Sequence, residues 1–137
     1  MHDTLRPGLT ATLTYEVASD RTVSHLLPES AEFADMPQVL ATGYLVGLVE
    51  WACMRALKGH LADGERTVGV HVDLSHDAPT SPGHTVTIEV ELTEVDGRML
   101  TFAVHGRDGT TQICAGTHRR AVVHLARFET KAASPRP

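Results

Sequence analysis

The stretch from Val39 to Leu57 (VLATGYLVGLVEWACMRAL) constrains the fold more than any other part of the chain. Apolar or small residues occupy nearly every position, and Glu50 and Arg55 are the only charged residues. A helix that is apolar all round is buried on all sides. Its uninterrupted apolar part, Val39 to Val49, is too short to span a bilayer, which takes about 20 residues. We therefore predict one long buried helix over 39–57.

The residues on either side of this helix predict strands. Leu9–Val17 is rich in threonine and apolar residues, as strands are. Asp20–Gln38 contains two prolines and suits short helical turns and loop. A last strand is expected from about Thr111 to Phe128, bent near Gly116. Three further strands are predicted from alternating apolar residues. The residues that share one face are Val68, Val70, Val72, Leu74 and His76 in the first, Val86, Ile88, Val90 and Leu92 in the second, and Leu100, Phe102 and Val104 in the third.

The order of these elements indicates an α+β fold. Asp96-Gly97 and Asp108-Gly109 are typical hairpin turns, so the strands after the helix are expected to be antiparallel. A five-stranded sheet buries an apolar helix most easily by curling around it. The sheet would keep a free edge, which favours a homodimer. Residues 1–130 are expected to form one domain, and 131–137 (KAASPRP) a flexible tail without large apolar residues.

Composition limits the partners that the chain can have. The formal net charge is −5 and the pI about 5.9, which argues against binding to nucleic acid or to an anionic membrane. Met1 to Pro7 contains no apolar run typical of a signal peptide. Cys53 and Cys114 form no C-x-x-C pair, so both are expected to be buried and reduced. A cytoplasmic location follows as the expectation.

Three residues are candidates for chemistry. Glu50 is a carboxylate in an apolar helix, where burial raises a carboxyl pKa toward the range of a general base. It also suits a structural pair with Arg55. His76 continues the apolar face that ends at Leu74, so it is expected to face the helix. Thr42 stands where the helix begins, and there it suits either capping of the first turn or catalysis.

Several other patterns do not form sites. Ser75, His76 and Asp77 are adjacent, so a strand would point them to opposite faces and they cannot form a triad. The nine histidines and two cysteines show no zinc-site spacing, and no nucleotide-binding glycine loop occurs. Of Arg119 and Arg120, one is expected to point outward, where it suits a solvated charge or a contact with a phosphate.

A family resemblance adds to these observations. The segment ATGYLVGLVEWACMRAL, preceded by HLLPESAEFADMP and followed by GTHRRAVVHL, resembles the fluoroacetyl-coenzyme A thioesterases and their hot-dog-fold relatives. The similarity runs without gaps from about Arg6 to Phe128. It implies a hot-dog fold, in which the sheet wraps around the helix and a short irregular or helical segment forms a lid. It also implies hydrolysis of a short-chain acyl-CoA, with no cofactor or metal.

The resemblance also implies roles for individual residues. Thr42, Glu50 and His76 correspond to the catalytic group of the family. Gly69 corresponds to a position that lines the thioester site, and Arg120 to one that contacts the substrate. Val23, Leu26 and Phe33 correspond to residues of the lid over the acyl pocket. Met36 departs from the family, because the fluoroacetyl-specific enzyme has an aromatic residue there. The thioether is more flexible than a ring, so the acyl preference, fluorinated or not, stays open.

These residues imply attack on the thioester carbonyl. Glu50 would attack or activate water, Thr42 would orient or polarise the reacting group, and His76 would move the proton. A backbone N–H near the helix start or at Gly69 would stabilise the oxyanion. Two alternatives remain on the same fold: a module that binds acyl-CoA without hydrolysis, and a dehydratase or hydratase. The dehydratases carry a histidine on or near the buried helix, and this helix has none. The carrier, coenzyme A or an acyl carrier protein, is not determined by the sequence.

Overall fold

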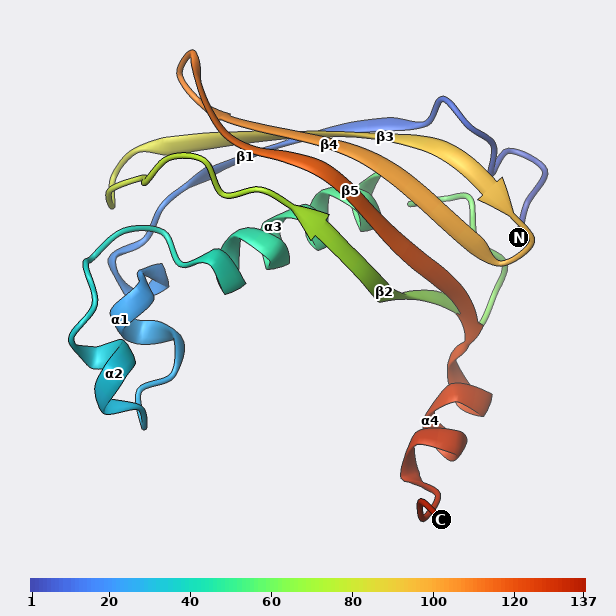
Figure 1. Cartoon of the computed structure of the whole chain (residues 1–137). Coiled ribbons are helices and arrows are strands. Elements are labelled where there is room, and N and C mark those ends of the chain that lie inside the picture. Colours follow the sequence, from blue (N-terminus) through green and yellow to red (C-terminus); the bar gives the residue numbers. More distant parts are fainter.

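A computed structural model describes all residues, 1–137. Its five strands form one antiparallel sheet in the order β1-β3-β4-β5-β2, and α3 lies beneath the curved sheet (Figure 1). This confirms the predicted α+β architecture. Short helices α1 and α2 lie beside the start of α3, and α4 projects from the opposite end (Figure 1). The elements are β1 (Thr10–Glu16), η1 (Ser19–Arg21), α1 (Val23–Leu26), α2 (Ala31–Ala34), α3 (Thr42–Ala56), β2 (Glu65–Leu74), β3 (Thr85–Asp96), β4 (Met99–Asp108), β5 (Thr111–His124) and α4 (Leu125–Ala133).

Helix α3 is shorter and less buried than predicted. It begins at Thr42 because the residues before it are extended: Leu40 forms a β-bridge with Thr22, and Ala41 is the N-cap. One face is buried against the sheet, whereas Trp51 and Met54 on another face are each 46% exposed. The prediction of burial on all sides is therefore wrong for the single chain. No helix is long and apolar enough to span a membrane. The buried residues of α3 are Leu45, Leu48, Val49, Ala52, Cys53 and Ala56.

The central strands follow the predicted alternation. Every predicted inward residue of β3 and β4 is buried, and both hairpin glycines have positive φ, as their tight turns require. Gly116 of β5 has φ +146°, and a Cβ there would lie 2.0 Å from the carbonyl oxygen of Asp73, so only glycine fits. The predicted end of this strand at Phe128 is wrong. β5 ends at His124 and the chain continues as α4, which extends to Ala133 into the expected tail.

Strand β2 differs most from the prediction. Alternation placed Val68 toward the helix and Gly69 away from it, but a Cβ on Gly69 would meet the Glu50 side chain of α3. A bulge between Gly69 and His71 is the reason, because one extra residue inverts the alternation. Beyond the bulge, Leu74 packs against the core as predicted. The strand ends there, and His76 lies in the following loop rather than in the strand.

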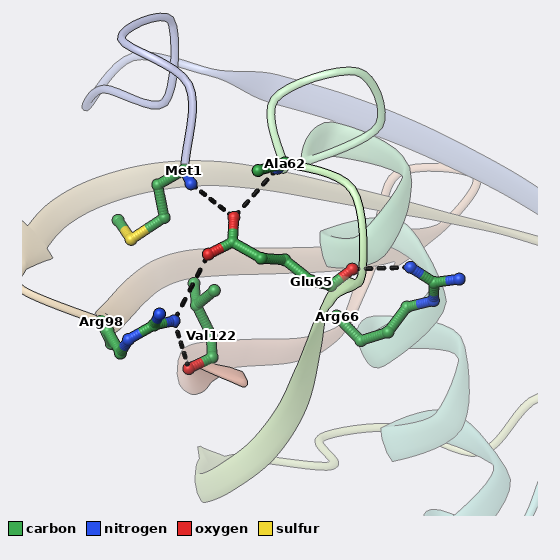
Figure 2. A network of polar contacts seen from close by, with 6 residues as sticks. All are labelled: Met1, Ala62, Glu65, Arg66, Arg98 and Val122. Carbon is green, nitrogen blue, oxygen red and sulfur yellow. Dashed lines mark hydrogen bonds and ion pairs between the residues drawn. The ribbon is translucent and has the colours of Figure 1, made fainter. Parts of the chain in front are cut away.

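A polar cluster around Glu65 joins three separate parts of the chain (Figure 2). The Glu65 side chain is 9% exposed and accepts hydrogen bonds from the Met1 ammonium and, at 2.9 Å, from the Ala62 amide. Arg98 donates to Glu65 at 3.4 Å and to the carbonyl of Val122 at 3.2 Å. These donors lower the pKa of Glu65, the Met1 ammonium most of all. The cluster therefore ties the first residue and the β3–β4 turn to the start of β2.

Candidate active site

Thr42 and His76 contact each other although 34 positions separate them. The Thr42 hydroxyl lies 2.8 Å from His76 Nδ1, so the first residue of α3 meets the loop after β2. The interpretation of Thr42 as a helix cap is wrong, because Ala41 is the N-cap and no side chain caps this end. His76 Nε2 is buried without a hydrogen-bond partner. Since buried polar atoms are rarely left unpaired, this atom is a candidate for contact with a substrate.

In the loop that carries His76, the residues before and after the histidine are both hydrogen-bonded to β5. The amides of Ser75 and Asp77 donate to the carbonyls of Ala115 and Ile113, at 2.8 and 2.7 Å. The Ser75 hydroxyl donates to the Asp77 carboxylate at 2.8 Å. Ser75 and Asp77 therefore bind each other while His76 bonds to Thr42, so the three form no triad, as predicted. Burial lowers the pKa of His76, and the charge of Asp77 opposes that shift.

Glu50 is paired with Arg120 rather than with Arg55. Arg120 Nη1 donates to Glu50 Oε2 at 2.9 Å; the Arg120 side chain is 3% exposed and the Glu50 side chain 37%. Arg55 instead lies over the Trp51 ring at 5.5 Å. The carboxylate is thus held through one oxygen, while Oε1 has no hydrogen bond within the chain. Of the neighbouring arginines, Arg119 is the exposed one, so the expectation that one points outward is confirmed.

Gly69 makes room for the Glu50 carboxylate. A Cβ at Gly69 would lie 2.7 Å from Glu50 Oε2, 3.3 Å from His118 Cε1 and 3.5 Å from Arg120 Nη1. A side chain at this position would therefore displace the ion pair. Gly69, Glu50 and Arg120, which come from β2, α3 and β5, form one cluster.

Two residues of this cluster were not predicted from the sequence. Thr67 accepts from Arg120 through its hydroxyl at 2.9 Å and its carbonyl at 2.8 Å. His118 is fully buried, with Nδ1 2.8 Å from the carbonyl oxygen of His71 and Nε2 3.2 Å from Arg120 Nη1. His118 could have been found from the sequence, because it lies two positions before Arg120 and alternate residues of a strand share a face.

The structure brings the predicted catalytic residues together in two groups rather than one. Thr42 and His76 lie at the start of α3, and Glu50 lies eight positions further along the helix. Eight residues correspond to about 12 Å along a helix axis and about 80° around it. Thr42 and Glu50 of one chain therefore do not point at the same spot.

The predicted lid lies at the Thr42 end of α3. The Leu26 side chain fills the space above Gly43, where a Cβ would come within 3.0 Å of Leu26 Cδ2. Val23 is anchored through its amide, which donates to the carbonyl of Val39 at 2.9 Å. Phe33 is half-buried and Met36 is 48% exposed. The expected helical turns of the lid are confirmed as η1, α1 and α2.

Comparison with known proteins identifies the family of this chain. Residues 17–126 match the family model FlK, fluoroacetyl-CoA-specific thioesterase. The fluoroacetyl-CoA thioesterase of Streptantibioticus cattleyicolor is 46% identical over 137 residues, covering 100% of this chain and 99% of that protein. A solved structure of the fluoroacetyl-CoA thioesterase FlK superposes with a TM-score of 0.94 at 46% identity, covering 98% of this chain and 100% of the other.

A more distant structure bears on the fold alone. A hot-dog-like protein from Thermanaerovibrio acidaminovorans superposes with a TM-score of 0.79 at 20% identity, covering 95% of this chain and 94% of the other. The curled sheet around α3 is thus the hot-dog fold that the resemblance implied. Together, the family match over most of the chain and the close full-length relative show that this chain belongs to the family of fluoroacetyl-CoA-specific thioesterases and is a thioesterase.

Proposed function

We propose that the chain hydrolyses a short-chain acyl-CoA to the free acid and coenzyme A, without a cofactor. The observation that carries this proposal is the Glu50 carboxylate, which Arg120 holds at 2.9 Å through one oxygen. The other oxygen, Oε1, has no hydrogen bond within the chain and is available to react, and the Glu50 side chain is 37% exposed. The substrate class is supported by the names of the family and of the 46% identical relative.

In the proposed reaction the thioester carbonyl carbon is attacked and its C–S bond breaks. Glu50 either adds to the carbonyl carbon, forming an anhydride that water then hydrolyses to release the acid, or removes a proton from the attacking water. His76, which is neutral in the free enzyme, takes up the proton that the attacking water loses and passes it to the leaving thiolate, and Thr42 orients the reacting group. The oxyanion is stabilised by backbone N–H groups at the start of α3, an end that no side chain caps. The lid residues Val23, Leu26, Phe33 and Met36 enclose the acyl group.

We propose further that the active protein is a homodimer. Strand β2 is an edge strand that pairs only with β5, so its outer edge is free to pair with a second copy. The exposed apolar residues near this edge support that arrangement: Val70 and Val72 of β2 are 47% and 48% exposed. Trp51 and Met54 of α3 are exposed as well, and aromatic residues and methionine are enriched in interfaces.

The dimer also explains the separation of the two groups of residues. Within one chain, Thr42 and Glu50 are about 12 Å apart along the helix, too far to act on one carbonyl carbon. In the proposed dimer, each site combines Glu50 of one subunit with the Thr42–His76 pair of the other. Gly69 and Arg120 then belong to the Glu50 side of each site.

A heterodimer tests both proposals. Co-expression with two affinity tags isolates a dimer of one Glu50→Gln subunit and one His76→Ala subunit. A site shared between subunits leaves one of the two sites intact, so we expect about half of the parent turnover of acetyl-CoA, although both homodimers are inactive. The matched control pairs an unaltered subunit with one that carries both substitutions, and it should be inactive. If instead the first heterodimer is inactive and the control keeps about half of the parent turnover, each site lies within one subunit.

Outcomes of the same experiment bear on the reaction itself. A Glu50→Gln homodimer with near-parent kcat/KM would remove Glu50 from the mechanism. Free coenzyme A should appear together with free carboxylic acid. Binding of acyl-CoA without release of coenzyme A would instead identify a non-hydrolytic module.

A further inference from the structure

His118 is the only fully buried histidine of the chain, and the reaction proposed above does not use it. Its ring lies on the same face of β5 as Arg120, which contacts Glu50 of α3. It links the carbonyl of His71, next to the β2 bulge, with the guanidinium of Arg120. A buried imidazole with two hydrogen bonds of defined direction can fix the position of its neighbours.

The two partners determine the protonation of the ring. A carbonyl can only accept, so Nδ1 carries the hydrogen toward His71. A guanidinium can only donate, so Nε2 presents its lone pair to Arg120 Nη1. Both contacts therefore require the same neutral tautomer. Burial lowers the pKa of His118, and the nearby charge of Arg120 adds to that shift while the bond to His71 opposes it.

Arg120 is held from three sides. Thr67 of β2 accepts from Nε and Nη2, and His118 and Glu50 share Nη1, at 3.2 and 2.9 Å. Removing the His118 acceptor would leave Nη1 with Glu50 as its only partner, so one of the three groups that fix the guanidinium would be lost. The Glu50 carboxylate follows Arg120, because no other hydrogen bond within the chain holds it.

We propose that His118 is a positioning residue: its neutral ring fixes the Arg120 guanidinium and, through it, the carboxylate of Glu50. This inference rests on the proposed function, because it requires Glu50 to act in catalysis. The ring does not touch the thioester. Its effect is to keep Glu50 in the geometry of attack, so it changes kcat rather than substrate binding.

Two conservative variants separate the two bonds of the ring. The amide of His118→Asn reaches the Nδ1 position and keeps the donor to His71, but it has no acceptor for Arg120. The amide of His118→Gln reaches the Nε2 position and keeps that acceptor. We expect the Asn variant to lose about tenfold in kcat with KM changed less than about twofold, and the Gln variant to stay within about threefold of the parent. His105→Asn, on an exposed residue of β4, is the matched control and should leave kcat unchanged.

Equal losses in the Asn and Gln variants, or a fully active Asn variant, would overturn the proposal. If a variant fails to fold, ¹⁵N NMR of the ring nitrogens in the parent protein decides. We expect Nδ1 protonated and Nε2 unprotonated at neutral pH, and the reverse tautomer or an imidazolium would refute the assignment. Failure of the proposed function is a separate result: Glu50→Gln would then retain turnover, whatever the two His118 variants do.

Discussion

Glu50 and Gly69 lie so close that a Cβ on Gly69 would stand 2.7 Å from the Oε2 atom of Glu50. That oxygen is the one that Arg120 holds. The backbone of β2 therefore packs directly against the ion pair of Glu50 and Arg120. A glycine is required here by the space that the carboxylate occupies, since Gly69, unlike seven other glycines, does not have a positive φ.

Gly69→Ala should lower kcat by about 10- to 100-fold while the protein stays folded. The added methyl group must push the Glu50 carboxylate away from Arg120, and a displacement of about 1 Å costs up to about 10² in rate. Gly47→Ala is the control, because nothing lies within 4 Å of a Cβ there. Steady-state kinetics and thermal unfolding of both variants check this. Equal kinetics of the two variants would contradict it.

This contact also shows where prediction from the sequence succeeds and where it stops. Strands β3 and β4 alternate regularly, so their buried faces could be predicted residue by residue. The face of Gly69 could not, because the bulge that inverts β2 has no clear marker in the apolar pattern. The partner of Glu50 could not be predicted either. Arg55 is near in sequence, whereas Arg120 is 70 positions away and is brought close only by the pairing of β5 with β2.

The two groups of catalytic candidates illustrate the same limit. Their identity was available from the family resemblance, and the contact of His76 with the start of α3 agreed with the expected facing. Their separation along α3 follows from helix geometry, so eight positions on one helix already indicate about 12 Å. Which face of α3 stays exposed could not be predicted, because the helix is apolar on nearly all sides and the pattern does not show where the sheet lies.

Asp77→Asn should move the acid limb of the kcat/KM profile to lower pH. In the proposed mechanism His76 is neutral in the free enzyme, so activity falls as it becomes protonated. Burial lowers its pKa and the Asp77 charge raises it. Removing that charge lowers the pKa further, and activity persists to lower pH. The amide can still bond to Ser75 and Gln112. A profile from pH 4.5 to 8 with an unchanged or higher acid limb would contradict this assignment.

Glu65→Gln should lower stability at neutral pH and leave it nearly unchanged in acid. The pKa of Glu65 is lowered in the folded protein, so the charged carboxylate stabilises the fold at pH values above its ordinary pKa in the unfolded chain. That contribution is lost as the pH falls through the lower, folded pKa. The loss at neutral pH should be about 1–3 kcal/mol, because the charge-assisted bonds to Met1 and Arg98 are weakened. Urea unfolding at pH 7 and at a pH below the folded pKa of Glu65 measures the difference. An equal loss of stability at both pH values would show that the charge of Glu65 does not stabilise the fold.

Val72→Lys should weaken the proposed dimer. Val72 is 48% exposed on the edge strand β2, and a lysine there would bring a positive charge from each subunit to the paired edge. Light scattering at micromolar concentration should show a dimer for the parent and a larger monomer fraction for the variant. Thr12→Lys, on the opposite edge strand β1, is the control. A parent that is monomeric at this concentration would rule out the dimer and the shared site.

Met36→Phe should narrow the range of acyl groups that the enzyme accepts. Met36 follows α2 in the lid and is 48% exposed, so the chain alone does not hold its side chain in one place. A thioether moves aside for a longer acyl chain, whereas a ring wedged over the pocket does not. One methylene changes discrimination by only about 1–3 kcal/mol, so the preference should be graded. The measurement is kcat/KM for acetyl-, fluoroacetyl-, propionyl- and butyryl-CoA, and the ratio of two-carbon to four-carbon substrates should rise in the variant.

An unchanged profile would show that Met36 does not line the pocket. A parent that already strongly prefers fluoroacetyl-CoA over acetyl-CoA would show that this choice does not need an aromatic residue at the lid.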